Sequence, residues 1–307
     1  MNAPEISQQA EWVRRPERSN RIMLRVMTWI SLRLGRAPAR FVLAGISLYF
    51  LLFAPAAKSA SRAYLRRALG REPTFADLFR HFHSFASTIH DRVFLLNARF
   101  DLFQVEVHAE DLIQAVLAAG NGAILMGAHM GSFEVARAIG RRQPGLKVVM
   151  VMYEENARKL NAALAAINPA AVQDIIPLGQ LDSMLRVQAC LDQGMVLGVL
   201  GDRTLGGDPT VRVPFLGAEA EFPVGPMRLA AMLKRPVLFM SGLYLGGNRY
   251  AIHFERLADF SDVERDGRDA AVEAAVVAYA ACLERHCRAA PYNWFNFFDF
   301  WRPKDAG

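Results

Sequence analysis

The stretch AILMGAHMGSFEVARA, residues 123–138, predicts a buried β-strand, a short glycine-containing turn and the start of a helix. Its uninterrupted apolar run is typical of a strand that is covered on both faces of a sheet. His129 follows this run, Ser132 can cap the helix, and Glu134 lies five residues after the histidine. The stretch therefore places an imidazole at the carboxyl end of a strand and a carboxylate in the first turn of the next helix.

The same alternation of strand and helix continues along the chain from residue 101. We expect strands at 102–107, 123–128, 147–152, 174–177, 195–200, 236–243 and 249–255, and helices near 110–119, 132–142, 156–167, 180–192, 225–234 and 267–288. Such alternation indicates an α/β fold with a mixed but mostly parallel central sheet and helices on both faces. Residues 60–100 predict further helices, one of which begins at Thr74 with Asp77 as the acidic residue of a capping box.

The N-terminal quarter of the chain is basic and apolar. Residues 21–36, RIMLRVMTWISLRLGR, predict a cationic amphipathic helix that lies in a membrane interface, with an ordinary surface helix as the alternative. Residues 41–57 carry no charge but contain Pro55, and they are slightly too short for a full membrane span. They predict a short tilted span, a re-entrant hairpin or a helix buried in the protein. We therefore expect a polar tail at 1–20, a membrane-associating segment at 21–72 and a catalytic domain at 73–303.

Charge and cysteine content narrow the function further. The net charge is +6, but residues 1–72 carry +9 and the rest of the chain carries −3. This distribution favours an anionic membrane surface as the partner and argues against nucleic acid. The cysteines Cys190, Cys282 and Cys287 have no CxxC spacing, so the sequence predicts free thiols and no metal site.

His129 is a candidate general base. In α/β sheets, ligands bind at the carboxyl ends of strands, and the flanking Gly127 and Gly131 let the backbone turn sharply and a substrate approach. The carboxylate of Glu134 could hold one ring nitrogen as a donor and leave the other free to take a proton. No Ser or Cys stands in a nucleophile-elbow setting, so the attacking group would come from the substrate. The alternative is a structural histidine beside a helix-capping carboxylate.

A second stretch, VLGVLGDRTLGGDPTVRVPFLGAEAEFPVGPMRLA at 196–230, places Asp202 and Arg203 just after another strand. This is a second carboxyl end, which can lie beside His129. Arg203 could bind a phosphate or carboxylate group, or pair with Asp202 and fix the loop. The stretch contains neither a P-loop nor a dinucleotide-binding glycine motif, so it predicts no nucleotide cofactor.

The motifs GAHMGSFE, GDRTLGG and VPFLGAEAEFPVGPMRLA, with the terminal APYNWFNFFDFW, resemble those of the bacterial lipid A late acyltransferases of the lauroyl/myristoyl type. These enzymes belong to the lysophospholipid acyltransferase-like superfamily, and the resemblance covers about residues 20 to 303. It implies a glycerolipid acyltransferase-like fold at the cytoplasmic face of the cell inner membrane, with no cofactor and no metal. It also implies either acyl carrier protein or acyl-CoA as the donor and a lipid as the acceptor.

The resemblance implies a role for each candidate residue. His129 removes a proton from the acceptor hydroxyl, Glu134 orients His129, and the hydroxyl attacks the donor thioester without a covalent acyl-enzyme. Backbone amides or Arg203 would stabilise the oxyanion, and Asp202, Arg203 and Gly131 are the substrate-binding candidates. Nothing in the sequence indicates the oligomeric state.

Several positions depart from the pattern of the family. Glu154 follows Tyr153 where relatives often carry Arg, DR stands at 202–203 where they carry DQ, and the C-terminus lacks their basic stretch. These differences change the charge where a phosphorylated sugar would sit. They keep open an acceptor other than lipid A, such as an aryl polyene or pigment lipid conjugate. An acyl ester or thioester hydrolase and a catalytically silent membrane-binding module are the alternatives from other classes.

Overall fold

A seven-stranded sheet forms the centre of the protein in the computed structural model, which describes residues 28–29, 31–33, 35–135, 146–168, 175–179, 182–204 and 208–301. The strand order is β1-β9-β8-β2-β5-β3-β4, and every pairing is parallel except the antiparallel pair β8–β9. The strands are β1 (Gln104–His108), β2 (Ala123–Gly127), β3 (Val148–Tyr153), β4 (Ile175–Leu178), β5 (Val196–Leu200), β8 (Pro236–Gly246) and β9 (Arg249–Asp259). The predicted α/β fold with a mixed, mostly parallel sheet is confirmed.

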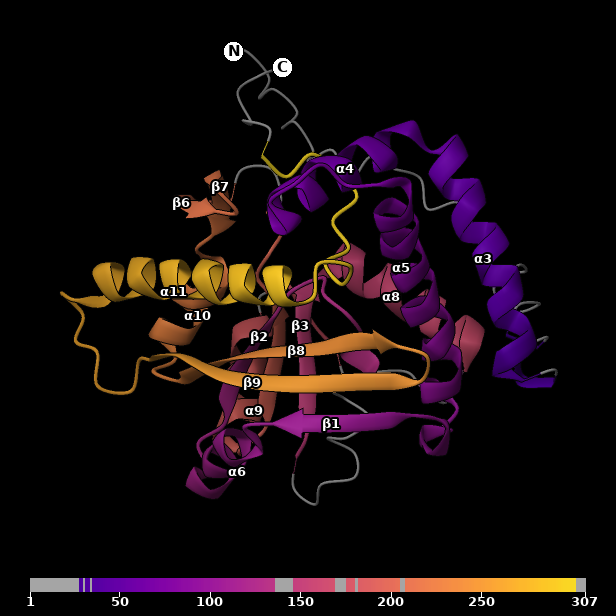
Figure 1. Cartoon of the computed structure of the whole chain (residues 1–307). Coiled ribbons are helices and arrows are strands. Elements are labelled where there is room, and N and C mark those ends of the chain that lie inside the picture. Colours follow the sequence, from indigo (N-terminus) through magenta and orange to yellow (C-terminus); the bar gives the residue numbers. More distant parts are fainter. Residues whose placement is uncertain are drawn as a thin grey trace, which may run out of the picture.

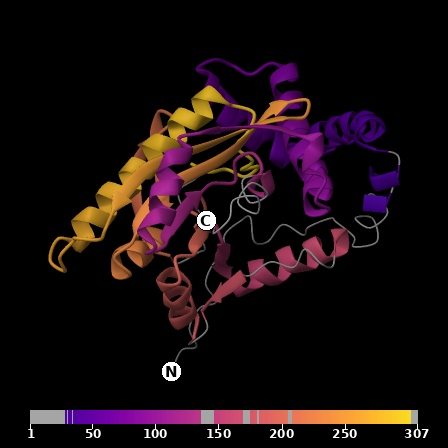
Figure 2. The same cartoon turned by 90° about the horizontal axis from the view of Figure 1, so that it is seen from below.

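Helices cover both faces of this sheet (Figures 1 and 2). They are α3 (Arg36–Phe53), α4 (Pro55–Leu69), α5 (Phe75–Leu96), α6 (Glu110–Ala119), α8 (Glu154–Ile167), α9 (Ser183–Asp192), α10 (Gly225–Met232) and α11 (Arg268–Ala289). Of the helix predicted at 132–142, residues 133–135 are helical and the remainder lies outside the described residues. The capping box at the start of α5 is confirmed, because Thr74 and Asp77 exchange hydrogen bonds there.

Alternate residues of β2 enter two separate cores. Ile124 and Met126 pack in the cluster that includes α10 and α11, whereas Ala123 and Leu125 pack in the cluster that includes α5 and α6. Because successive side chains of a strand point to opposite faces, an all-apolar strand is stable only where both faces are covered. The apolar run of β2 therefore fixes this strand in the middle of the sheet.

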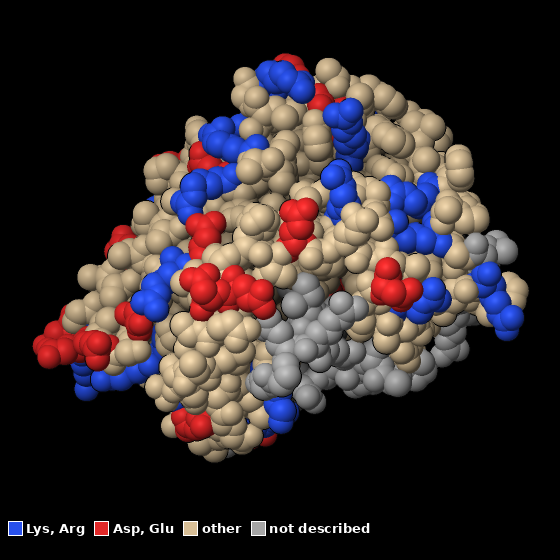
Figure 3. All heavy atoms as spheres, turned by 60° about the horizontal axis from the view of Figure 1, so that its bottom comes forward, with Lys and Arg blue, Asp and Glu red and all other residues tan. Residues whose placement is uncertain are grey.

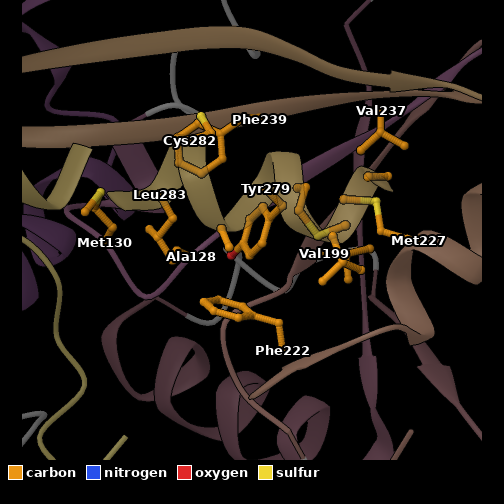
Figure 4. Packing of buried hydrophobic residues seen from close by; sticks show 14 of the residues in the cluster. Ala128, Met130, Val199, Phe222, Met227, Val237, Phe239, Tyr279, Cys282 and Leu283 are labelled. Atoms are coloured by element: carbon orange, nitrogen blue, oxygen red, sulfur yellow. The ribbon is translucent and has the colours of Figure 1, made fainter. Parts of the chain in front are cut away.

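Tyr279 of α11 joins the first core to the end of β2 (Figure 4). Its ring lies edge-on to Phe222 and is tilted against Phe239, with centroids 5.9 and 6.0 Å away. Its hydroxyl donates a 2.8 Å hydrogen bond to the carbonyl of Gly127, the last residue of β2. A buried aromatic residue of α11 therefore fixes the carboxyl end of β2 through a hydrogen bond.

The sequence did not predict the antiparallel hairpin of β6 (Thr210–Phe215) and β7 (Ala218–Pro223). Its two-residue turn has positive φ at both positions, 51° at Leu216 and 77° at Gly217. Such turns favour Asn-Gly or Asp-Gly. Because leucine stands at the first position here, the sequence does not show the usual signal of a hairpin. The structure supports this conformation because the Leu216 amide donates to Oε2 of Glu284 at 2.6 Å.

The N-terminal helices pack on the rest of the fold. Arg36 at the start of α3 makes two hydrogen bonds, of 2.6 and 2.7 Å, to the buried carboxylate of Asp91 in α5. The Tyr250 hydroxyl of β9 donates to the same carboxylate at 2.7 Å. Leu51 and Leu65 add apolar side chains from α3 and α4 to the first core. The position of α3 is therefore fixed relative to the sheet, and the domain boundary expected near residue 72 remains a prediction.

Helix α3 is the one described helix that is long and apolar enough to cross a membrane. Helix α3 ends before Ala54, and α4 begins at Pro55. Proline is favoured in the first turn of a helix because its missing backbone N–H would have no helical partner there. Residues 41–57 are thus parts of two helices. One face of α3 packs inward through Leu43, Ser47 and Leu51. Its other side leaves large apolar side chains exposed: Phe41, Val42, Leu48, Tyr49, Phe50, Leu52 and Phe53.

The amphipathic helix predicted for 21–36 lies partly outside the described residues. Within the described part, Trp29 is exposed whereas Thr28 and Ser31 are buried. On the face of the molecule in Figure 3, basic and acidic side chains are interspersed among wide areas of other residues. The visible charges on this face therefore form no continuous field of one sign.

Candidate active site

Parallel pairing of β2 and β5 brings His129 and Asp202 together. The last residues of the two strands, Gly127 and Leu200, are register partners, and each candidate residue follows two positions later. A hydrogen bond of 3.0 Å from the Gly201 amide to the Gly127 carbonyl continues the pairing into the loops. The two side chains therefore leave neighbouring strands at the same height above the sheet edge where α/β folds bind ligands.

The carboxylate of Asp202 is fully buried and receives four hydrogen bonds. Its Oδ1 lies 2.8 Å from Nδ1 of His129, and its Oδ2 accepts the backbone amide of His129 at 2.9 Å. Oδ2 also accepts Nε1–H of Trp294 at 2.8 Å and Nδ2–H of Asn296 at 3.0 Å. This network fixes the carboxylate and, through it, the imidazole.

The electrostatics of the pair favour a neutral imidazole beside an ionised carboxylate. Burial alone would raise the pKa of Asp202, but the hydrogen bonds and charge of His129, with the nearby Arg203, hold that pKa well below its usual range. Burial and the charge of Arg203 lower the pKa of His129, and Asp202 offsets this only in part. Because an ionised carboxylate only accepts, Nδ1 carries the ring proton and Nε2 keeps a free lone pair.

The imidazole of His129 is only partly enclosed by the described residues. The His129 side chain keeps 29% of its surface exposed, whereas that of Asp202 keeps none. Within the described parts of the chain, Nε2 makes no hydrogen bond. His129 therefore has the arrangement of a general base: one nitrogen is fixed by a carboxylate and the other is open.

The expected position of Glu134 is corrected, because Asp202 occupies the place beside Nδ1 of His129 that was predicted for Glu134. Glu134 is buried in the first turn of the following helix, and its Oε1 lies 3.8 Å from Nε of Arg92 in α5. The physical reason is the strand register, which aims Asp202 at the imidazole from the adjacent strand. The carboxylate of Glu134 thus lies beside Arg92 of α5 and not beside the imidazole of His129.

Arg203 lies inside the site and contacts the C-terminal segment. Its Nε donates to Oδ1 of Asn296 at 2.8 Å, its Nη2 donates to the Phe295 carbonyl at 3.3 Å, and its guanidinium lies 5.6 Å from the ring centre of Phe298. Burial lowers the pKa of Arg203 to about 10, with Asp202 acting against this shift. Arg203 therefore remains a cation at neutral pH, held close to His129 and Asp202.

The segment after α11 passes over the His129 loop and binds it through the backbone. The Phe295 amide donates to the His129 carbonyl at 2.7 Å, and the Gly131 amide donates to the Asn293 carbonyl at 2.8 Å. Between them, Met130 and Trp294 form an antiparallel bridge. The aromatic C-terminus is therefore part of the site itself.

The sequence did not identify the roles of Trp294 and Asn296. The only signal was an aromatic cluster interrupted by two asparagines, which is equally typical of a core. Because Trp294 is the largest fully buried side chain and its indole N–H reaches Asp202, it serves both as core and as a ligand of the carboxylate.

Gly131 is required by a close backbone contact. Its φ is 61°, and a Cβ at this position would lie 2.0 Å from the carbonyl oxygen of Gly242 in β8. That same oxygen accepts the Ser132 amide at 2.7 Å. Gly131 was predicted to let a substrate approach. In the structure, its missing side chain lets the backbone of β8 approach the loop.

The backbone amides of this loop are already in use. Those of His129, Met130, Gly131 and Ser132 donate to Asp202, Ala128, Asn293 and Gly242, respectively. None of these four is left to stabilise an oxyanion. Arg203, the other candidate predicted for this role, places a positive charge near the imidazole.

Comparison with known families shows the family to which the sequence is similar. The sequence matches the family model described as bacterial lipid A biosynthesis acyltransferase over residues 16–303, which includes every residue of the site. No curated protein matches the sequence.

Proposed function

The chain belongs to the bacterial lipid A biosynthesis acyltransferase family, and we propose that it transfers a fatty acyl group from a thioester donor to a hydroxyl of a lipid acceptor at the membrane surface. The observation that carries the mechanism is the His129–Asp202 pair, with a buried carboxylate on Nδ1 and an open Nε2. The donor is either acyl carrier protein or acyl-CoA, and both present the same reacting thioester.

His129 acts first as a general base and then as a general acid. Its Nε2 takes the proton of the acceptor hydroxyl while the oxygen bonds to the thioester carbonyl carbon. Asp202 stabilises the imidazolium that forms. The tetrahedral intermediate then collapses, the carbon–sulfur bond breaks, and the leaving thiolate takes the proton from Nε2. The products are an ester and a free thiol, without an acyl-enzyme.

Arg203 supplies positive charge for the developing oxyanion in this proposal. A buried cation held by Asn296 is already oriented, so it need not reorganise when charge appears on the carbonyl oxygen. The same charge lowers the pKa of His129 and keeps the base neutral. Glu134 is assigned a positioning role, because its charge lies beside Arg92 at the start of the helix that follows the loop.

The exposed apolar side of α3 is proposed to contact lipid at the cytoplasmic face of the inner membrane. Eighteen helical residues span about 27 Å, slightly less than the hydrocarbon core of a bilayer. A helix of this length lies in the interface or enters it at a tilt. Because Arg36 ties α3 to Asp91, such contact would hold the site close to a membrane-bound acceptor.

The acceptor has two candidates within this reaction. A lipid A precursor is the family's substrate, whereas a different lipid conjugate is favoured by Glu154, which is exposed at the start of α8 directly after β3. An acidic residue there disfavours a phosphorylated sugar by charge repulsion.

Mass spectrometry of lipid A and total lipids tests the proposal in cells that carry the wild type, His129→Ala or the control His83→Ala. Loss of one acyl chain from lipid A in the His129→Ala cells alone supports the family substrate. Unchanged lipid A with loss of an acyl group from another conjugate supports the second acceptor. Release of free fatty acid by the purified wild type without transfer would identify a hydrolase, and identical lipids in all three strains would refute the role of His129.

A further inference from the structure

A second group of chemically reactive side chains lies between α11 and β9, on elements that do not carry the His129 pair. Glu255, Cys282 and His286 bring a carboxylate oxygen, a thiol sulfur and an imidazole nitrogen within 4.8 Å of one another. The sequence analysis did not indicate this group, because the three residues form no cysteine motif and come from two elements.

Local geometry explains why these groups converge. Cys282 and His286 are four residues apart in α11, which places them on the same face of the helix one turn apart. Glu255 and His253 are two residues apart in β9, so they share one face of the strand. The two faces meet, since the rings of His253 and His286 lie 5.3 Å apart.

The carboxylate of Glu255 is the centre of the group. Its Oε1 lies 2.7 Å from Nε2 of His286, and the Cys282 sulfur lies within 4.8 Å of ligand atoms of both residues. Its Oε2 accepts a hydrogen bond from Arg285 at 2.5 Å. On the other side of the imidazole, Nδ1 of His286 lies 3.4 Å from the hydroxyl of Ser241.

Two of the three side chains are buried and the third is partly exposed, an arrangement that suits a bound ion. The Cys282 and His286 side chains are almost fully buried, whereas the Glu255 side chain keeps 36% of its surface exposed. The two inner donors are thus held by packing, and the carboxylate opens to solvent. An ion could enter on the side of Glu255 without unfolding the helix.

We propose that Glu255, Cys282 and His286 bind a divalent zinc-class metal ion, a site distinct from the His129 centre. One thiolate, one imidazole and one carboxylate form a donor set typical of Zn²⁺, with the fourth position taken by water. On binding, the Cys282 thiol releases its proton to solvent. The ring proton of His286 resides on Nδ1, which can donate a hydrogen bond to the Ser241 hydroxyl, so Nε2 is free for the metal. The ion would join α11 to β9.

Metal titration of the full-length protein tests the site. After removal of metal with a chelator, we expect the wild type to bind one equivalent of Zn²⁺ and to show a thiolate-to-cobalt charge-transfer band with Co²⁺. Cys282→Ser should lose the band, whereas the matched control Cys190→Ser, a cysteine of α9 outside the group, should keep it. Glu255→Gln should weaken Zn²⁺ binding about tenfold or more.

Circular dichroism of the metal-free variants separates loss of a ligand from loss of the fold. If Cys282→Ser does not fold, Glu255→Gln serves in its place, because the Glu255 carboxylate is partly exposed. Absence of stoichiometric Zn²⁺ binding by the folded wild type would overturn the proposal. Persistence of the cobalt band in folded Cys282→Ser would also overturn it.

Discussion

Asp202 receives the Nδ1–H of His129 at 2.8 Å, although the two residues are 73 positions apart in the chain. The bond joins the carboxyl ends of β2 and β5 and is enclosed by Trp294 and Asn296. It sets the tautomer of His129 and leaves Nε2 open. The orientation of the proposed base therefore depends on a neighbouring strand and on the C-terminal segment.

Replacing Asp202 by Asn should lower kcat by about 10²–10⁴-fold with a small change in KM, because the amide can donate to Nδ1 and stabilise the wrong tautomer. Initial rates of acyl transfer to a lipid acceptor measure the effect. The matched control is Asp208→Asn, which removes a carboxylate that accepts from Tyr153 in an exposed contact. Equal rates for Asp202→Asn and the wild type would rule out Asp202 as the orienting group.

The pH profile should report the protonation of His129. Only neutral His129 accepts a proton, so kcat/KM should fall as the pH drops through its pKa, which burial and Arg203 hold below 6.5. Arg203→Gln removes one of these two causes and should move the acidic limb to higher pH. Arg212→Gln, which alters an exposed ion pair with Glu221, should leave the limb in place. An unmoved limb in Arg203→Gln would contradict the assigned electrostatics.

Gly131→Ala should destabilise the protein by a few kcal/mol and disrupt the His129 loop. The new Cβ would lie 2.0 Å from the carbonyl oxygen of Gly242, and the three nearest atoms all belong to the backbone of Gly242 and Leu243, which cannot move aside cheaply. Gly120→Ala is the control, because Gly120 has a similar φ of 69° but nothing within 4 Å of the new Cβ. It should cost only about 1 kcal/mol. Similar unfolding midpoints in urea for the two variants would show that the close contact is not limiting.

Charged substitutions on the outer side of α3 should release the protein from membranes. Phe41 and Phe53 are 85% and 66% exposed, and each Asp placed there would oppose burial in lipid. Flotation with vesicles that contain anionic lipid measures binding of Phe41→Asp/Phe53→Asp. Leu185→Asp, at a 70% exposed position on α9, is the control and should float like the wild type. Full flotation of the α3 variant would place the membrane contact elsewhere.

The sequence by itself determined the strands of the central sheet, most of the helices and the position of His129 at a strand end. These features follow from local patterns: the apolar run of β2, the capping box of α5 and the spacing of apolar residues in α6. The β6–β7 hairpin was not visible in the sequence, because Leu216 adopts a positive φ that a distant glutamate stabilises.

Only the tertiary structure decided which carboxylate orients His129. In sequence Glu134 is the nearer acid, but strand order and register place Asp202 at Nδ1 and leave Glu134 beside Arg92. The roles of Trp294 and Asn296, and the meeting of α11 with β9 at Glu255, arise in the same way. Hydrogen bonds between residues far apart in the chain depend on how whole elements pack, and side-chain spacing along one element does not encode that packing.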